Sequence, residues 1–288
     1  RQVASTDATV LLRGESGTGE GVVARAIHAW SLRSEAPFVV VHCPSLSSDL
    51  LESELFGHIK GAFTGAIRTN PGRVAQAEHG TLFLDEIGDL PAPLQAKFLR
   101  FLQDREYERV GDPTMRRADV RILAATNQEL QAAVREGRFR EDLFYRLNVI
   151  DLEVPPLRTR PEDVLPLAQQ FMAFFARRYG RRLQGFSPVA ERALRHYPWP
   201  GNVRELQNAV ERAVILTQGD MITPESLPFV PQDAKPEALH VGGMVSLAML
   251  EEAHIRRVVA ATETLDEAAQ VLGIDPATLW RRRKQYGI

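Results

Sequence analysis

The feature that most constrains the fold of this 288-residue chain is a glycine-rich turn at residues 14–21. The turn follows a short apolar strand at 9–12 and opens a segment with helical periodicity that runs to about residue 32. The core-facing residues of this helix are expected to be Val22, Val23, Ala26, Ile27 and Trp30. A turn between a buried strand and a helix start leaves backbone N–H groups unpaired, and the helix dipole adds positive charge there. The sequence therefore predicts a phosphate-binding turn.

The glycine spacing of this turn is that of a P-loop, with one departure. The predicted nucleotide-binding residues are Gly14, Glu15, Ser16, Gly17, Thr18, Gly19, Glu20 and Gly21. Glu20 stands where a P-loop carries its lysine, so the charge that would bind phosphate is reversed. We expect the Glu20 side chain to turn towards solvent, so that the backbone N–H groups still bind phosphate, but more weakly.

A second apolar strand, at 82–84, ends in two carboxylates, Asp85 and Glu86. A carboxylate pair at a strand end is typical of sites that hold Mg²⁺ and polarise a water molecule. This pair disfavours the alternative that the glycine-rich turn is a plain connection. Asn127 lies at the end of a third buried strand, at 120–125, where polar residues face the ligand crevice of an α/β sheet.

Strands and helices alternate along the first half of the chain. Further strands are expected at 38–42 and 149–152, and helices at 50–56, 93–103, 130–136 and 141–147. This alternation predicts an α/β domain with a parallel, helix-covered sheet over residues 1–156. Residues 157–229 show helical patterns only, with helices expected at 164–179, 188–196 and 203–217, and are predicted to form a helical lid subdomain.

The end of the chain predicts a separate all-α domain. Residues 230–245, with several prolines and a glycine pair, are predicted to be a linker, and residues 246–288 a helix-turn-helix domain. Thr264 and Asp275 are predicted helix N-caps, and Gly273 the turn between the two helices. The alternative, a solvated basic helix end, is disfavoured because caps and turn agree. The predicted DNA-binding residues are Thr278, Arg281, Arg282, Arg283 and Lys284.

A loop rich in small residues lies between the glycine-rich turn and the carboxylate pair. It consists of Gly61, Ala62, Phe63, Thr64, Gly65 and Ala66. Its glycines make the backbone permissive, and it carries one aromatic side chain. Composition alone leaves two interpretations open, a mobile surface loop or a binding loop.

Bulk composition excludes several classes of protein. A formal net charge of −2, with 25% charged residues, excludes a basic or acidic polymer. The single cysteine, Cys43, excludes an internal disulfide and fits a reducing compartment, so a cytoplasmic location is expected. No apolar run is long enough to cross a membrane, and no membrane partner is expected. The chain begins one short segment before its first strand, so an upstream regulatory domain is expected.

Taken together, these motifs resemble those of bacterial enhancer-binding proteins of the NtrC type. These are AAA+ ATPases that remodel RNA polymerase carrying the alternative sigma factor sigma-54. The resemblance covers essentially all 288 residues and implies a AAA+ sheet, a helical lid and a Fis-type DNA-binding domain. It implies ATP and Mg²⁺ as cofactors, with binding weakened here by Glu20. It also implies double-stranded DNA and sigma-54 RNA polymerase as partners, and a homo-oligomer that ranges from a dimer to a hexameric or heptameric ring.

The resemblance also implies roles for individual residues. Asp85 would hold Mg²⁺ and Glu86 would activate the attacking water, whereas the loop 61–66 would contact sigma-54. Asn127 falls in the sensor I segment and Arg204 matches sensor II. Arg140 and Arg146 match the arginine fingers that one subunit offers to the nucleotide of its neighbour. Within the family, three segments are most similar to the alginate-biosynthesis response regulators: 43–46, 107–113 and 281–287.

Two departures from the family pattern bear on activity. Glu20 replaces the P-loop lysine, and His42 stands where the family usually has an asparagine bonded to the glutamate at position 86. A histidine can still donate a hydrogen bond to Glu86, but with a different reach and with a charge that depends on pH. Two functions therefore stay open: an activator that uses ATP to remodel sigma-54 polymerase, or a DNA-binding regulator that acts without ATP turnover. A glutamate introduced deliberately to trap one nucleotide state would give the same sequence.

Overall fold

The computed structural model describes residues 2–45, 47–228, 246–262 and 264–287. The chain divides into two compact units, Arg1–Pro228 and Phe229–Ile288, and each is treated by itself. The predicted linker at 230–245 lies outside the described residues. No helix among the residues that the structure describes is both long and apolar enough to span a bilayer.

The first unit is built on a five-stranded parallel sheet, as predicted. Its strands are β1 (Val10–Gly14), β2 (Phe38–His42), β3 (Thr81–Asp85), β6 (Arg121–Thr126) and β7 (Ile150–Val154). Their order across the sheet is β2-β3-β6-β1-β7, and every pairing is parallel. Because β6 lies between β1 and β3, the turns that follow these strands end side by side at one edge.

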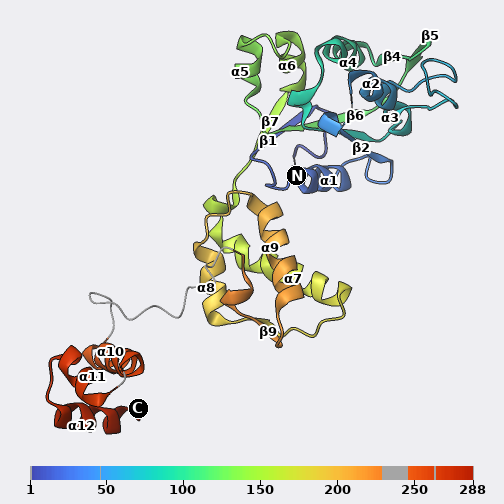
Figure 1. Cartoon of the computed structure of the whole chain (residues 1–288). Helices are drawn as coiled ribbons and strands as arrows, with labels where there is room; N and C mark the ends of the chain where they lie inside the picture. The colour runs from blue at the N-terminus through green and yellow to red at the C-terminus, as the bar shows by residue number, and fades with distance from the viewer. Residues whose placement is uncertain (1, 46, 229–245, 263, 288) are drawn as a thin grey trace. The chain divides into compact units, whose positions relative to one another are not determined.

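Side chains alternate between the two faces of the sheet, and each face has its own helical cover (Figure 1). Val10, Leu12 and Phe83 pack with α1 (Glu20–Ala29) on one face. Leu11 and Leu82 belong to a larger core on the other face. That core is covered by α2 (Ser48–Phe56), α3 (Arg73–Gln76), α4 (Ala92–Asp104), α5 (Leu130–Arg135) and α6 (Glu141–Leu147).

The prediction for α1 was correct for Ile27, which is buried, and for Val23, which packs against the same core, but it was wrong in the helix length and for Val22 and Trp30. The helix ends at Ala29, and its buried residues are Ala24, Ile27 and His28. Val22 is 72% exposed and Trp30 is 60% exposed. A polar residue takes one core position because the His28 ring nitrogen Nδ1 lies 2.9 Å from the Thr81 hydroxyl oxygen, which satisfies both groups. An apolar pattern alone could not indicate this.

The segment predicted as a hairpin or insertion is a hairpin. Strands β4 (Glu106–Arg109) and β5 (Asp112–Arg117) pair antiparallel, and Gly111 between them has a φ of +80°. The hairpin is bonded to the segment that precedes the loop 61–66, because the Val110 N–H donates to the Gly57 carbonyl at 2.9 Å. Short 3-10 turns connect other elements: Cys43–Ser45, Ile87–Asp89, Leu157–Thr159, Pro161–Asp163 and Pro224–Ser226.

The lid subdomain is helical, as predicted. It contains α7 (Val164–Arg178), α8 (Pro188–His196) and α9 (Asn202–Leu216). A parallel pair of two-residue strands, β8 (Gly185–Phe186) and β9 (Met221–Ile222), is too short to show in the sequence pattern. Trp199 is fully buried in the lid core, and its indole N–H donates to the Leu194 carbonyl at 2.9 Å.

The second unit contains α10 (Leu247–Ala261), α11 (Leu265–Leu272) and α12 (Pro276–Tyr286). The predicted caps are confirmed, since the Thr264 hydroxyl accepts from the Glu267 N–H and the Asp275 carboxylate accepts from the Ala277 N–H. Gly273 turns the chain with a φ of +65°. A small core made of Ile255, Ala268, Ala269 and Leu279 holds the helices together. The predicted helix-turn-helix is therefore present.

Candidate functional site

The sheet brings three of the predicted site segments together. The glycine-rich turn follows β1, the two carboxylates follow β3, and Asn127 follows β6, which lies between them. The Asn127 backbone N–H donates to the Glu86 carboxylate at 3.2 Å. Gly17 and Gly19 have φ values of +84° and +107°, a backbone conformation that favours glycine.

Glu20 does not turn towards solvent, and that expectation was wrong. Its Oε1 accepts a hydrogen bond from the Thr18 hydroxyl at 2.7 Å, and its Oε2 accepts from the Gly19 N–H at 3.2 Å. Oε1 also lies 2.8 Å from where a Cβ on Gly14 would be, so the carboxylate rests against the concave side of the turn. Unpaired N–H groups and the helix dipole attract an anion there, and a glutamate at the first helical position supplies one. The Glu20 carboxylate therefore lies on the side of the turn where a phosphate group would be expected to bind.

The carboxylate pair at the end of β3 contacts His42 through Asp85. The His42 Nε2 lies 3.0 Å from the Asp85 carboxylate, and the hydrogen bond that the sequence allows from His42 to Glu86 is not formed. The register of the sheet explains this, because His42 on β2 is paired directly with Asp85 on β3. Glu86 follows with a φ of +56° and turns towards Asn127 instead. In this sheet, His42 is therefore a partner of the predicted Mg²⁺ ligand.

The carboxylates of the site lie close enough to raise one another's pKa values. Burial raises the pKa of Asp85, and the neighbouring Glu20 carboxylate raises it further, whereas His42 and Arg204 lower it. Burial also raises the pKa of Glu86, which the Asn127 N–H opposes. Among the described residues, no cluster of three or more His, Cys, Asp or Glu side chains is arranged to hold a metal ion. Asp85 alone would have to hold Mg²⁺ together with phosphate oxygens.

The lid is anchored on the outer side of the same turn. Arg204 of α9 donates to the Ser16 hydroxyl at 2.7 Å, which places the predicted sensor II residue at the turn. Arg158 makes a bidentate pair with Glu15, with N–O distances of 2.5 and 2.6 Å. Hydrogen bonding to Arg158 lowers the pKa of Glu15 from 4.5 to about 2, so this exposed pair is fully charged above 4.5 and is lost only as the pH falls towards 2.

Asn202 is a site residue that the sequence analysis missed. It is fully buried and has a φ of +54°. Its amide donates to the Glu15 carboxylate and to the Ser16 carbonyl, both at 3.2 Å, and its side-chain oxygen accepts from the Leu157 N–H at 2.8 Å. The Gly17 carbonyl in turn accepts from the Val203 N–H at 2.9 Å. The start of α9 is therefore hydrogen-bonded directly to the turn.

A cavity of about 510 Å³ lies beside these contacts. It is bordered by Ser16 from the turn and by Arg204, Asn208 and Arg212 from α9. Two arginines and a hydroxyl are groups that suit an anionic ligand such as a nucleotide. Arg160 adds a further cation at the turn, because its guanidinium donates to the Thr18 carbonyl at 2.9 Å. The sequence analysis missed Arg160 and Arg158, and their only signal was the basic segment 158–160 before α7.

The predicted arginine fingers lie on α6 and its N-cap, exposed to solvent. Arg140 is paired with Asp142 two residues on, with N–O distances of 3.0 and 2.7 Å. Arg146 donates to the Leu102 carbonyl of α4 at 3.2 Å. Within the described part of the chain, neither guanidinium bonds to the turn at 14–21 of its own subunit.

The loop 61–66 projects from the unit with its aromatic side chain exposed. Gly61 and Gly65 have φ values of +84° and +102°, and the Gly61 N–H donates to the Ala66 carbonyl at 2.9 Å. Phe63 is 37% exposed and packs edge-on against His58, with ring centres 5.1 Å apart. Thr64 is exposed. The loop is therefore a closed turn that presents Phe63 and Thr64 outward.

The basic residues of α12 fall into two groups. Arg281 and Lys284 are exposed, and the Lys284 ammonium lies 5.4 Å from the ring centre of the exposed Trp280. Arg282 is instead half-buried and bonded to Glu251 of α10, with an N–O distance of 3.0 Å. The other two predicted DNA-binding residues, Thr278 and Arg283, are half-buried. Trp280 was missed, although its spacing from Lys284 along the helix indicates a shared face.

Comparison with known proteins identifies the class. A model of the sigma-54 interaction domain matches residues 1–153, and a model of the AAA+ ATPase lid domain matches residues 158–241. A model of bacterial regulatory proteins of the Fis family matches residues 246–286. The chain therefore belongs to the family of the sigma-54 interaction domain, with a AAA+ lid and a Fis-family helix-turn-helix.

Sequence identity to individual relatives shows which members of the family the chain resembles. The chain is 59% identical over 288 residues to the alginate biosynthesis transcriptional regulatory protein AlgB of Pseudomonas aeruginosa, and it spans 64% of that protein. It is 49% identical over 281 residues to the transcriptional regulatory protein ZraR of Escherichia coli, where 96% of the chain aligns with 63% of the relative. The predicted similarity to the alginate-biosynthesis branch is confirmed. The chain corresponds to somewhat less than two thirds of these relatives.

Solved structures agree with the fold. The crystal structure of NtrX from Brucella abortus in complex with ADP is 36% identical, with a TM-score of 0.74. All of this chain aligns, to 66% of the NtrX chain. The structure of NtrX in complex with ATP gives the same TM-score of 0.74.

Replacing Glu20 tests whether its carboxylate excludes phosphate from the turn. Glu20→Lys is expected to raise affinity for ATP with Mg²⁺ by about two orders of magnitude or more, because one charge pair near 4 Å is worth roughly 4 kcal/mol at an effective dielectric of 20. The Glu20→Gln variant, which removes the charge and keeps the shape of the side chain, should have an ATP affinity between those of the unmodified and Glu20→Lys proteins. Calorimetric titration of the variants gives the affinities.

Glu35→Lys is the matched control for that series, because it makes the same charge change at an exposed position after α1. It should leave nucleotide affinity as in the unmodified chain. Equal affinity of the unmodified and Glu20→Lys proteins would show that the carboxylate moves aside without hindrance, and the exclusion would be refuted.

Proposed function

We propose that this chain is the part of a sigma-54-dependent transcription activator that binds DNA and contacts the polymerase. The observation that carries the proposal is the exposed loop 61–66, which lies inside the region that matches the sigma-54 interaction domain. The basic, solvent-facing side of α12 supports double-stranded DNA as the second partner. With these two partners, the chain would act in the cytoplasm, next to the polymerase.

We further propose that the chain works as a homo-oligomer, from a dimer to a hexameric or heptameric ring. Arg140 and Arg146 support this, because both are exposed and neither bonds to its own subunit's turn within the described residues. In such a ring they would reach the γ-phosphate held by a neighbouring subunit. The pair of Arg140 with Asp142 would open on assembly.

A second candidate function is a regulator that acts without ATP turnover, and Glu20 specifically favours it. A carboxylate that already occupies the anion position of the turn would compete with the β- and γ-phosphates. In this form the chain would oligomerise and act at promoters by contact or occlusion. ATP-driven remodelling would need a lysine at position 20 or another cation in its place.

The loop prediction separates partner contact from nucleotide chemistry. In a Glu20→Lys background, Thr64→Ala is expected to keep ATPase activity and to lower activation of sigma-54 polymerase by about tenfold or more, since contact residues at the centre of an interface carry most of its energy. Thr69→Ala, at the exposed base of the same segment, is the control. If ATPase activity and activation fall together, the loop has a structural role.

The arginines should act across a subunit boundary. In the same background, a subunit with Arg140→Ala and one with Glu86→Gln are each expected to lose on the order of 10³ in turnover. Mixing them creates some interfaces with an intact finger and an intact site, so turnover should partly return. An absence of recovery at every mixing ratio, with mixed oligomers verified by mass spectrometry, would contradict the role in trans.

The two groups of basic residues on α12 should behave differently. Arg281→Ala is expected to weaken duplex binding and to reduce the slope of log affinity against log salt by about 0.9, as one phosphate contact is lost. Arg282→Ala should instead lower the stability of the second unit by up to about 1 kcal/mol, through loss of the Glu251 pair. Salt-dependent fluorescence anisotropy and thermal unfolding measure the two effects. A slope that changes equally in both variants would refute the division.

A further inference from the structure

A cluster of arginines on the lid is not used by any site described above. Arg177 and Arg178 end α7, and Arg181 and Arg182 follow directly after Gly180. No acidic residue lies between Asp163 and Glu191 in the sequence. These four arginines are called the lid basic surface below.

The lid is the positive part of the chain. Residues 157–228 carry ten arginines against seven acidic residues, a net charge of +3. Residues 1–156 carry 18 basic and 22 acidic residues, a net charge of −4, and residues 246–288 carry six of each. The helix-turn-helix unit is therefore electrically neutral overall, and the positive excess lies on the lid.

The charges of the lid basic surface are not neutralised by the lid itself. Arg177 donates to the Ala173 carbonyl at 3.2 Å, Arg181 donates to the Thr217 carbonyl, and Arg178 lies 5.7 Å from the ring centre of Tyr179. Within the described residues, no carboxylate lies at ion-pair distance from any of the four, whereas Arg158 and Arg160 of the same lid have such partners. Arg177, Arg178 and Arg182 are exposed.

The surface is hollowed as well as charged. A groove of about 550 Å³ is lined by three of the arginines, by two alanines, and by one leucine, one glutamine and one aspartate. The lining consists of Ala173, Ala176, Arg177, Arg181, Arg182, Leu183, Gln184 and Asp220. Asp220 is the one carboxylate of this lining, and it accepts a hydrogen bond from the Gln184 amide. Arginine guanidinium groups around a groove suit phosphate groups, which they bind with parallel hydrogen bonds.

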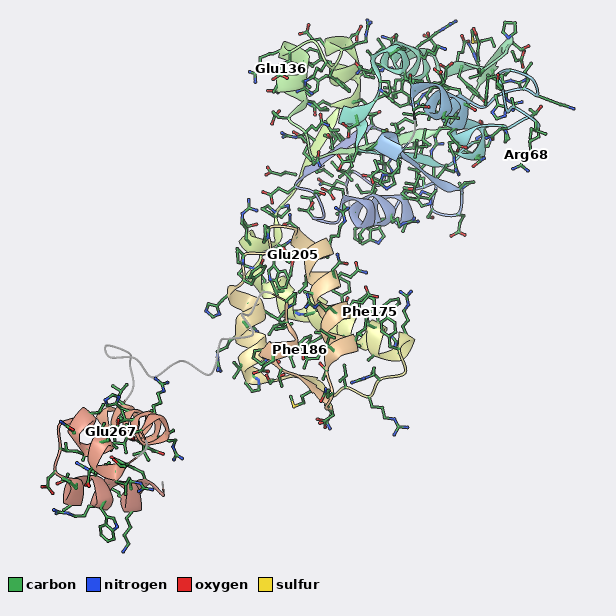
Figure 2. The ribbon with its side chains drawn as sticks, viewed as in Figure 1. Arg68, Glu136, Phe175, Phe186, Glu205 and Glu267 are labelled. Atoms are coloured by element: carbon green, nitrogen blue, oxygen red, sulfur yellow. The ribbon has the colours of Figure 1, made fainter. Side chains whose placement is uncertain are left out.

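The aromatic residues beside the arginines decide which nucleic acid fits. The Tyr179 hydroxyl donates to Glu211 at 2.6 Å, and its ring stacks on Phe175 with centres 6.3 Å apart. Phe175 lies in the lid (Figure 2), is buried and packs edge-on against Phe174, whereas Phe174 is 51% exposed and Tyr179 is 41% exposed. A single-stranded ligand needs successive free aromatic faces for base stacking, and of the two exposed rings the Tyr179 ring is already stacked on Phe175 and lies 5.7 Å from the Arg178 guanidinium. Contacts to the phosphates of a duplex need only the guanidinium groups.

We propose that the lid basic surface is a second, sequence-independent contact for double-stranded DNA. The inference rests on the proposed function, because the helix-turn-helix is what brings a duplex to the chain. A duplex bound by one unit is present at high local concentration for the other, since both belong to one polypeptide. The lid arginines then add phosphate contacts, which strengthen binding without changing which sequence is preferred.

The test uses the full chain and two duplexes of equal length, an operator selected from a random pool by the unmodified chain and a scrambled sequence. The lid variant is Arg177→Gln, Arg178→Gln and Arg182→Gln, which leaves Arg181 bonded to Thr217. The lid variant should bind both duplexes at least about tenfold more weakly near 0.1 M salt, with a log–log salt slope reduced by about 2 to 3, while the ratio of the two affinities is unchanged.

The matched control removes three exposed arginines from the first subdomain: Arg68→Gln, Arg117→Gln and Arg135→Gln. It makes the same change in net charge and should leave the slope nearly unchanged. If both triple variants lost the same amount of duplex affinity and salt slope, the effect would be explained by overall charge and the proposal would be overturned. An unchanged slope in the lid variant, with circular dichroism showing an intact fold, would overturn it as well.

Two further arms separate this inference from the proposed function. The double variant Arg281→Ala with Lys284→Ala should lose the preference for the operator but keep binding to the scrambled duplex. If adding the lid substitutions then removes that remaining binding, the lid contact and the helix-turn-helix assignment are both supported. If scrambled binding already vanishes in that background, the lid surface fails while the helix-turn-helix assignment stands. Loss of binding to an acidic polypeptide, with duplex binding unchanged, would point to a protein partner and refute the DNA contact.

Discussion

The structure depends on how the backbone N–H groups of one glycine-rich turn are satisfied. Gly17 and Gly19 shape the turn at the start of α1, where the helix dipole adds positive charge that favours an anion. In this chain the anion comes from the next residue, because Glu20 accepts from the Gly19 N–H and the Thr18 hydroxyl. The same position would be needed by the phosphates of a nucleotide, so an internal ligand stands where an external one would bind.

The same turn also holds the lid. Its outer side bonds to the start of α9 through Asn202 and Arg204, and Arg158 pairs with Glu15. A substitution on the inner side of the turn would therefore be expected to disturb the lid contacts, since both sides belong to the same few peptide groups. The carboxylates at the end of β3 lie near enough to be affected by Glu20 as well, which raises the pKa of Asp85. Position 20 therefore lies on the turn that holds the lid and affects the pKa of the candidate metal ligand.

The sequence was sufficient to predict those elements that depend on interactions between residues close together in the chain. Strand–helix alternation predicted the parallel sheet, and the caps at Thr264 and Asp275 were correct because each depends on neighbouring residues. Features that depend on distant partners were missed. The buried face of α1 includes His28 because its ring forms a hydrogen bond with Thr81 of β3. His42 contacts Asp85 because the β2–β3 register places the two residues opposite each other. Arg282 follows the same rule, since only the folded unit places Glu251 beside it.

We expect the Glu20 carboxylate to fill the anion position of the turn and so to prevent ATP chemistry. The most direct measurement is steady-state ATP turnover of the unmodified chain over a series of protein concentrations, with Glu86→Gln as the background. The account predicts that turnover stays at this background at every concentration, including those at which oligomers form. Turnover that rises with protein concentration and disappears in Glu86→Gln would contradict it, and would mean that another cation supplies the missing charge.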